Sequence, residues 1–215
     1  MAKREFKGGT MLNPVPVVMV SCGGAEEKPN IITVAWTGIV NSEPPMTYVS
    51  VRKSRYSHDI IARDKTFVIN LVNEKLVEKT DFCGVKSGRD IDKFEVTGLT
   101  AIPGSETGCP MIEESPVNME CRVVDVHEYP SHDMFVAEIV KVHVDEDIID
   151  RNDRMRLDRA DLVCYNHGEY FGVKEESLGK FGFSVMKDKT KKKLMKEASK
   201  ESRDRSRMKS KRKHG

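Results

Sequence analysis

The sequence lacks the features that mark membrane, secreted and metal-binding proteins. Its 215 residues contain no run of about 18 apolar residues, and the N-terminus has no apolar stretch long enough for a secretory signal. Its five cysteines are odd in number and form no C-x-x-C pair, which argues against a disulfide framework or a thiolate metal site. We therefore expect a soluble cytoplasmic protein with free thiols, no metal and no attachment to a membrane.

Nucleotide-binding fingerprints are also missing. The sequence has no G-x-G-x-x-G motif, so it shows no tight, dedicated nicotinamide site. It has no βαβαβ alternation either, which argues against a doubly wound parallel sheet. A classical dinucleotide fold is therefore not predicted.

Net charge is small over the whole chain but not along it. The formal charge is +2, yet residues 186–215 carry 14 Lys or Arg against 4 Asp or Glu, so the rest sums to about −8. This basic segment has almost no large apolar residues and cannot bury enough surface to fold alone. It also lacks the interleaved aromatics used for base stacking. We expect this segment to be a solvated, disordered tail. Binding of nucleic acid, an acidic protein or anionic lipid by the tail is the less favoured alternative.

Strand patterns dominate the rest, which we divide into an N-terminal extension (1–10) and one domain (11–185). Residues 15–22 are β-branched and apolar, and residues 43–51 alternate with period two after a Pro-Pro turn. The other predicted strands are residues 32–40, 66–72, 117–130 and 132–145, of which the last two form a hairpin through the link PSHD. About six closely spaced strands with short inserted helices indicate a mainly β fold, a closed or nearly closed antiparallel barrel.

The remaining segments suggest short helices and one long excursion. Residues 57–65 can form a helix with Ser57 as its N-cap, and residues 73–84 a second one. Asp59 in the first helix would oppose an anion at that helix start, so we expect its side chain to point away. Residues 85–115 are rich in Gly and turn formers and are predicted to be a surface loop, a kind of segment that is often functional.

Residues 30–61 combine an aromatic strand with a cationic helix start. Asn30, Thr33 and the single tryptophan, Trp36, lie on the predicted strand. Hydroxyl and cationic groups follow where the first N–H groups of a helix have no intrahelical partner: Arg52, Lys53, Arg55 and Ser57. A phosphate monoester is well matched to such a site through charge-assisted hydrogen bonds. The segment therefore predicts a site for a flat, phosphorylated cofactor.

Seven segments in order carry a resemblance to a known family. They are NxxTxAWxxxxxxxPP, SVRKSRYSHDII, FVINL, DFCG, SGRDIDKF, PMIEESPVNMECRV and SHDMFVAEIVKVHVDED. Together they resemble the flavin reductase-like family, most closely its flavoredoxin branch, from about Met11 to Val185. The resemblance implies an FMN-binding split β-barrel, an antiparallel Greek-key barrel, that forms a homodimer with one flavin per subunit near the interface. It also implies electron transfer through FMN from a reduced nicotinamide or a redox-protein donor to an acceptor.

The resemblance also assigns residues to the flavin. Asn30 and Trp36 resemble flavin contacts and Ser57 resembles the phosphate contact. With the positions drawn from the other segments, the candidate cofactor-binding residues are Asn30, Thr33, Trp36, Thr37, Arg52, Lys53, Ser57, Cys83, Gly84, Lys93, His132 and Tyr165. No catalytic side chain is required, because the flavin carries the redox chemistry. Lys93 or His132 would stabilise the anionic reduced ring, and backbone N–H groups near Cys83 and Gly84 would bond its carbonyl edge.

Each assignment has a plainer alternative. A lone strand tryptophan such as Trp36 is commonly a core residue, and Lys93 or His132 in a loop or turn is commonly solvated. Cys83 is expected to be a small buried residue rather than a redox thiol. At the level of function, the alternative to a reductase is a non-catalytic FMN-binding electron carrier that docks on a partner redox protein, and nucleic-acid binding by the tail ranks last.

Overall fold

The computed structural model describes residues 1–24, 28–174, 177–187 and 190. The chain divides into two compact units, Met1–Glu175 and Glu176–Gly215. The first contains all the strands given below, and the described part of the second contains a short 3-10 helix, η4 (Phe183–Val185). The predicted basic tail, 186–215, lies almost entirely outside the described residues.

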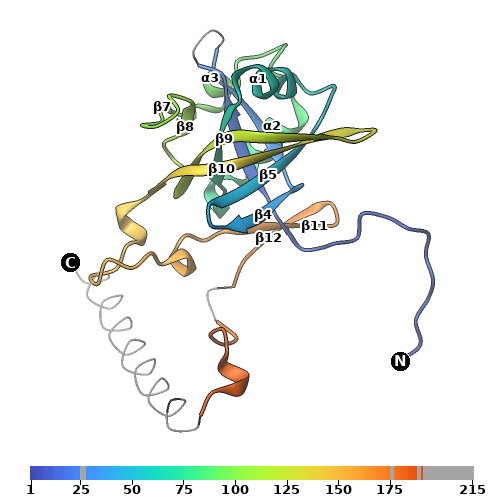
Figure 1. The fold of residues 1–215 in the computed structure, drawn as a ribbon, viewed down its shortest axis with the longest axis vertical. Coiled ribbons are helices and arrows are strands. Elements are labelled where there is room, and N and C mark those ends of the chain that lie inside the picture. The colour runs from blue at the N-terminus through green and yellow to red at the C-terminus, as the bar shows by residue number, and fades with distance from the viewer. Residues whose placement is uncertain (25–27, 175–176, 188–189, 191–215) are drawn as a thin grey trace. The chain divides into compact units, whose positions relative to one another are not determined.

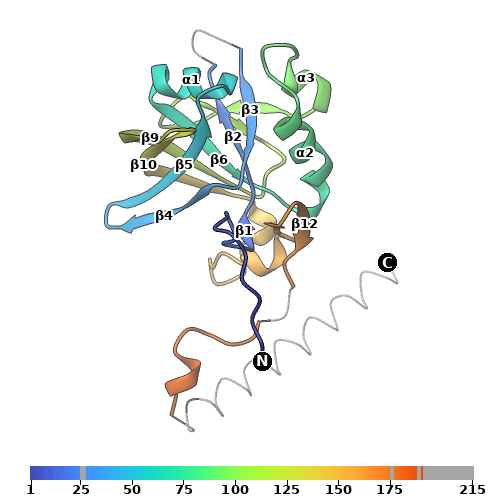
Figure 2. The same cartoon turned by 90° about the vertical axis from the view of Figure 1, so that its right-hand side faces the viewer.

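In the described residues, seven strands form one antiparallel sheet in the order β3-β2-β6-β9-β10-β5-β4 (Figures 1 and 2). The strands are β2 (Val18–Cys22), β3 (Asn30–Val34), β4 (Thr37–Ser42), β5 (Pro45–Arg52), β6 (Thr66–Leu71), β9 (Val117–Glu128) and β10 (His132–Val144). The long β9–β10 hairpin is the one predicted through PSHD. The mainly β, antiparallel split barrel expected from the sequence is confirmed.

The barrel closes at a bend that the sequence did not predict. The two edge strands of the sheet, β3 and β4, are consecutive in the chain, and only Ala35 and Trp36 separate them. At this bend the backbone N–H of Ser50 on β5 donates to the carbonyl oxygen of Trp36 over 2.9 Å. The prediction of one strand over residues 32–40 is therefore wrong, because its two halves pair with different neighbours, β3 with β2 and β4 with β5.

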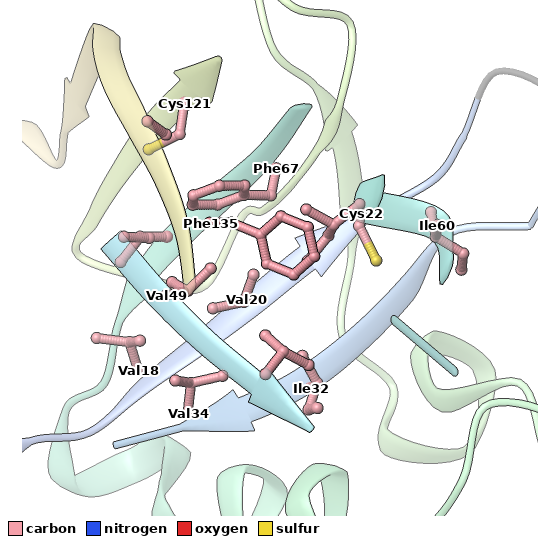
Figure 3. Close-up of a cluster of buried hydrophobic side chains, with 14 residues drawn as sticks. Val18, Val20, Cys22, Ile32, Val34, Val49, Ile60, Phe67, Cys121 and Phe135 are labelled. Carbon is pink, nitrogen blue, oxygen red and sulfur yellow. The ribbon is translucent and has the colours of Figure 1, made fainter. Parts of the chain in front are cut away.

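Alternating strand residues fill the barrel with apolar side chains (Figure 3). Val18 and Val20 of β2 point into the same cluster as Phe67 and Phe135, which come from β6 and β10. Helix α1 (Tyr56–Asp64) adds a further layer to this core with Ile60 and Ile61. This arrangement follows from the period-two pattern of the strands and the inner face of the short helix.

Two helices cover the outer side of β3 (Figure 2). Helix α2 (Val77–Val85) continues a 3-10 turn, η1 (Glu74–Leu76), and α3 (Lys93–Thr97) follows it. The buried Leu76 of η1, Cys83 of α2 and Phe94 of α3 pack with Met19 and Ile31, the residues of β2 and β3 that point out of the barrel. Both faces of β3 are therefore buried. This packing holds the strand in place, and with it the side chains at its two ends.

Residues 85–115 are not the loose surface loop that the sequence predicted. They contain α3 and a hairpin of β7 (Ala101–Pro103) and β8 (Pro110–Ile112), and Met111 and Ile112 are buried. The side chain of Asn70 fastens the hairpin, because its Oδ1 accepts from the Ile112 N–H over 3.0 Å and its Nδ2 donates to the Met19 carbonyl over 2.9 Å. Such buried amides hold distant segments together without any local sequence signal.

A second small sheet brings the C-terminal part of the first unit to the barrel. It consists of β1 (Val15–Pro16), β11 (Val163–Asn166) and β12 (Glu169–Gly172) in the order β1-β11-β12. Two 3-10 turns, η2 (Glu146–Ile148) and η3 (Leu157–Arg159), lie between β10 and this sheet in the chain. Among the described residues, no helix combines the length and the apolar character needed to cross a membrane.

Candidate functional site

An aromatic cavity of about 640 Å³ lies where the barrel is split, at the bend between β3 and β4. Its walls come from β3 and the bend, from the end of β5, and from the small β11–β12 hairpin. Its lining includes Ile32, Thr33, Trp36, Arg52, Arg55, Gly84, Ser131, His132, Tyr165 and Tyr170. The cavity is thus formed by parts of the chain that only the barrel's closure brings together.

Three aromatic side chains line this cavity. Trp36 lies in the bend rather than on a strand, and 42% of its surface is exposed, so it is not the core tryptophan of the plainer reading. Tyr165 and Tyr170 face each other across the β11–β12 hairpin in an edge-to-face pair with ring centroids 5.7 Å apart. Flat aromatic walls of this kind suit a planar ligand.

Tyr170 is held in place by a carboxylate and stays protonated. Its hydroxyl donates to Asp81 Oδ1 over 3.1 Å. Burial, then the hydrogen bond and the charge of Asp81, raise the pKa of Tyr170 to about 12. Tyr170 is not among the residues predicted from the sequence, although the Asn-His-Gly turn of CYNHGEY is a hairpin signal that pairs it with Tyr165.

His132 lies on the same cavity, at the start of β10 and opposite Arg52 of β5. Burial, and secondly the positive charge of Arg52, lower the pKa of His132 below its ordinary value. The ring is therefore neutral at pH 7. A contact of 2.8 Å joins its Nδ1 to the hydroxyl of Ser131.

A second, polar cavity of about 440 Å³ adjoins the aromatic one. Ile32, Arg52 and Arg55 line both, so the two cavities are neighbours at these residues. The second cavity carries cationic and hydroxyl groups around the start of α1: Arg52, Ser54, Arg55, Ser57, Lys86, Ser87 and Lys93. The first N–H groups of α1 have no acceptor within the helix and add to its positive potential. This end of the site suits an anion.

Ser57 lies at this cationic end but is not the N-cap that the sequence predicted. The cap position is Arg55, and Ser57 is a buried residue of the first helical turn. Its hydroxyl oxygen accepts a hydrogen bond of 2.7 Å from Asn30 Nδ2. Because a hydroxyl has one donor of its own, Ser57 can still donate to an anion in the cavity.

Lys93 is the buried cation of this cavity, with 3% of its surface exposed. Its Nζ donates to the carbonyl oxygens of Ile31, over 2.7 Å, and Cys83, over 2.6 Å. Burial lowers the pKa of Lys93. An ammonium has three donors, so these two bonds leave one for a ligand, and the reading of Lys93 as a solvated loop residue is wrong.

Cys83 and Gly84 are residues of α2, and they line the second and the first cavity respectively. Burial raises the pKa of the Cys83 thiol to about 11, which leaves it protonated and agrees with a small buried residue rather than a redox thiol. A Cβ added at Gly84 would lie 3.1 Å from Thr33 Cβ, so glycine permits α2 to approach β3 closely. Thr33 Oγ1 itself donates to the Thr80 carbonyl of α2.

Two of the predicted site residues are not brought to either cavity. Lys53 follows Arg52 and forms ion pairs with Asp133 at 3.2 Å and Glu128 at 3.0 Å. The hydroxyl of Thr37 donates to the Tyr48 carbonyl over 2.6 Å. The structure therefore gives both residues roles in joining strands, and we leave them out of the site.

Comparisons with known proteins find relatives in sequence and in fold. Residues 10–174 match the family profile described as the flavin reductase like domain. The flavoredoxin of Desulfovibrio vulgaris (Miyazaki F) superposes with a TM-score of 0.80 at 30% identity, over 86% of this chain and 100% of that chain. A protein of Archaeoglobus fulgidus is 34% identical over 116 residues, 54% of this chain and 66% of that protein. An NADH-dependent FAD reductase of Streptomyces globisporus is 26% identical over 129 residues, 59% of this chain and 68% of that protein.

Proposed function

Because the chain belongs to the flavin reductase-like family, we propose that it binds FMN and acts as an oxidoreductase that passes electrons from a reduced nicotinamide or a protein donor to an acceptor. The observation that carries the proposal is an aromatic cavity next to a cationic one, with Ile32, Arg52 and Arg55 lining both. FMN has the matching parts, a flat ring at one end and a phosphate monoester at the other.

The donor set of the second cavity fits a phosphate. The hydroxyl of Ser57, the remaining donor of Lys93 and the guanidinium of Arg55 surround one space at the start of α1. Hydrogen bonds from such groups to a charged oxygen are worth roughly 1.5–3 kcal/mol each. We assign the phosphate to this space and the ring to the space beside Trp36, Tyr165 and Tyr170.

Once bound, the flavin supplies the hydride and electron transfer, and the protein supplies its orientation and electrostatic surroundings. His132 is neutral and Tyr170 is protonated, so neither adds charge beside the ring. Two cations, Arg52 and Arg55, line both cavities, and Arg55 is already assigned to the phosphate. We therefore assign stabilisation of a negatively charged reduced ring to Arg52, in place of the earlier candidates His132 and Lys93.

We also propose that the chain forms a homodimer. Three large apolar side chains are exposed close together along the chain, in the bend and on the edge strand β4: Trp36, Ile39 and Val40. Exposed apolar groups on an edge strand are typical of an interface. A dimer built on this edge would extend the wall of the aromatic cavity beyond Trp36.

Anaerobic stopped-flow reduction tests the proposed activity. The FMN-loaded protein should lose its visible flavin absorption rapidly when mixed with NADH or NADPH, because an oxidoreductase of this kind accepts hydride from a nicotinamide. The second candidate function, an electron carrier, is favoured by the missing dinucleotide fingerprint, and it predicts bound FMN that neither nicotinamide reduces. Failure of the full-length protein to bind any flavin would contradict both.

A further inference from the structure

Three polar residues outside both cavities form an ionic cluster: Lys53, His58 and Asp133. The carboxylate of Asp133 lies at its centre, with Oδ2 at 2.8 Å from His58 Nε2 and Oδ1 at 3.2 Å from Lys53 Nζ. The side chains of His58 and Asp133 are only 14% and 10% exposed. None of these three described residues lines either cavity. The cluster therefore needs an explanation other than direct contact with a ligand.

Each member of the cluster directly follows a residue that lines the site, and the three pairs lie on three different elements. The pairs are Arg52 with Lys53 where β5 ends, Ser57 with His58 in the first turn of α1, and His132 with Asp133 at the start of β10. Because successive strand residues point to opposite faces, His132 faces the aromatic cavity whereas Asp133 points toward α1. The cluster thus joins β5 and β10 to the helix that begins at the phosphate end.

His58 makes the contacts that link these elements. Its ring packs edge-to-face on Phe135 of β10, with ring centroids 5.4 Å apart, and its Nδ1 contacts Asp59 Oδ1 at 3.1 Å. Asp59 Oδ2 in turn pairs with Arg89 Nη2 at 3.0 Å. The contacts therefore continue to the segment after α2, where residues 86–88 line the second cavity. Asp59 itself lines neither cavity.

The charge of Asp133 makes the cluster resistant to separation. Burial opposes ionisation of Asp133, but its contacts with His58 and Lys53 lower its pKa below the ordinary value. Asp133 is therefore a carboxylate at neutral pH. Removing one partner from a buried ion pair is strongly destabilising, so the cluster opposes any shift of α1 relative to β10. Lys53 is also paired with Glu128 of β9, at 3.0 Å.

We infer that Lys53, His58 and Asp133 are positioning residues, which hold the ring end and the phosphate end of the site at the spacing that one FMN molecule requires. The inference rests on the proposed function. Breaking the cluster leaves the donors and walls of each end in the chain but allows the start of α1 to shift relative to β5 and β10. A ligand that bridges both ends then loses affinity, whereas a ligand that occupies only the ring end does not.

The test measures the dissociation constants of the full-length apoprotein for FMN and for riboflavin, by quenching of flavin fluorescence. His58→Leu keeps an apolar side chain against Phe135 but removes both ring nitrogens. It should weaken FMN binding by about tenfold, the equivalent of one hydrogen bond to a charged group, and change riboflavin binding by less than about twofold. His58→Gln keeps a donor for Asp133 and should recover most of the FMN affinity.

Lys53→Met repeats the test at the most exposed member of the cluster, where the fold is least at risk. The Lys53 side chain is 45% exposed. Because an exposed ion pair contributes less than a buried one, this variant should weaken FMN binding by about threefold and leave riboflavin binding unchanged. Melting curves of the apoproteins show that each variant is folded.

His127→Leu is the matched control, because His127 also pairs with an aspartate, Asp125 at 3.1 Å, but both side chains are exposed on β9. It should leave both affinities unchanged. Equal losses of FMN and riboflavin affinity in His58→Leu, an unchanged FMN affinity in either cluster variant, or no recovery in His58→Gln would overturn the inference while leaving the proposed function intact. Binding of neither flavin by the wild-type protein would instead overturn the proposed function.

Discussion

Glu120→Gln should lower the free energy of unfolding by about 3–5 kcal/mol, the cost expected when one partner of a buried ionic network is removed. Glu120 lies on β9, and its carboxylate is completely buried. One oxygen accepts from the Thr107 N–H over 2.8 Å, and the other contacts His143 Nε2 at 2.7 Å. A glutamine amide group cannot accept from all these donors, so some would stay buried without a partner.

Gly104 precedes the loop that contains Thr107, and its close packing leaves that loop little room to adjust to a changed side chain at position 120. A Cβ added at Gly104 would collide with Glu120 Oε2 and lie 2.6 Å from its Cδ, so the loop is moulded around the carboxylate. Chemical denaturation followed by circular dichroism measures the effect. Glu113→Gln, at an exposed glutamate, is the control and should change stability by less than about 0.5 kcal/mol. A loss below about 1 kcal/mol in Glu120→Gln would show that the network contributes little.

The same network predicts how stability changes with pH. Although burial opposes ionisation, the hydrogen bonds from His143, Thr107 and Glu106 lower the pKa of Glu120 from 4.5 to about 2. A depressed folded-state pKa contributes stability above the unfolded value, here about 3 kcal/mol, and that contribution is lost as the pH falls from about 4.5 towards 2. The stabilities of the wild-type protein and Glu120→Gln should therefore converge over this interval.

Lys93→Met should weaken FMN binding by about a hundredfold, within the range expected for a hydrogen bond to a charged group. The replacement keeps a long side chain in the buried position but removes the only cation of the second cavity that is itself buried in the described structure. A buried charge acts on a phosphate with little screening by solvent. Affinity is measured on apoprotein shown by its melting curve to be folded.

Lys86→Met provides the matched comparison, because Lys86 lines the same cavity but is exposed. Its loss should cost no more than about threefold in FMN affinity, since an exposed charge is well screened. Riboflavin, which lacks the phosphate, should bind equally to wild-type and Lys93→Met proteins. Equal, small losses for the two lysine variants would show that burial of Lys93 serves only the fold.

Local patterns predicted the strands and the neighbourhood of the site, but not which partners each residue would find. The period-two alternation that identified β5 depends only on adjacent residues. By contrast, the bend at Trp36 arises because β3 and β4 pair with different strands, and nothing in the run of residues 32–40 encodes that choice. For this reason, the prediction of strand structure in residues 32–40 was largely correct, whereas the prediction of one continuous strand was wrong.

The role of individual polar residues was hardest to predict. Ser57 was selected as a helix cap from its position before an apolar pair, but its oxygen bonds to Asn30, which lies 27 residues away in the chain. Lys93 has an acceptor 62 residues away at Ile31, so its burial is a property of the fold alone. Resemblance to a family identified both positions, whereas their contacts required the structure.

The central claim is that one flavin mononucleotide spans the two neighbouring cavities, with its ring beside Trp36 and its phosphate at the start of α1. The most direct test titrates the same full-length apoprotein with FMN and with riboflavin, which differ only by the phosphate. The account predicts that FMN binds at least about a hundredfold more tightly, as one or two charge-assisted hydrogen bonds require. Equal affinity for the two compounds, or binding of neither, would contradict it.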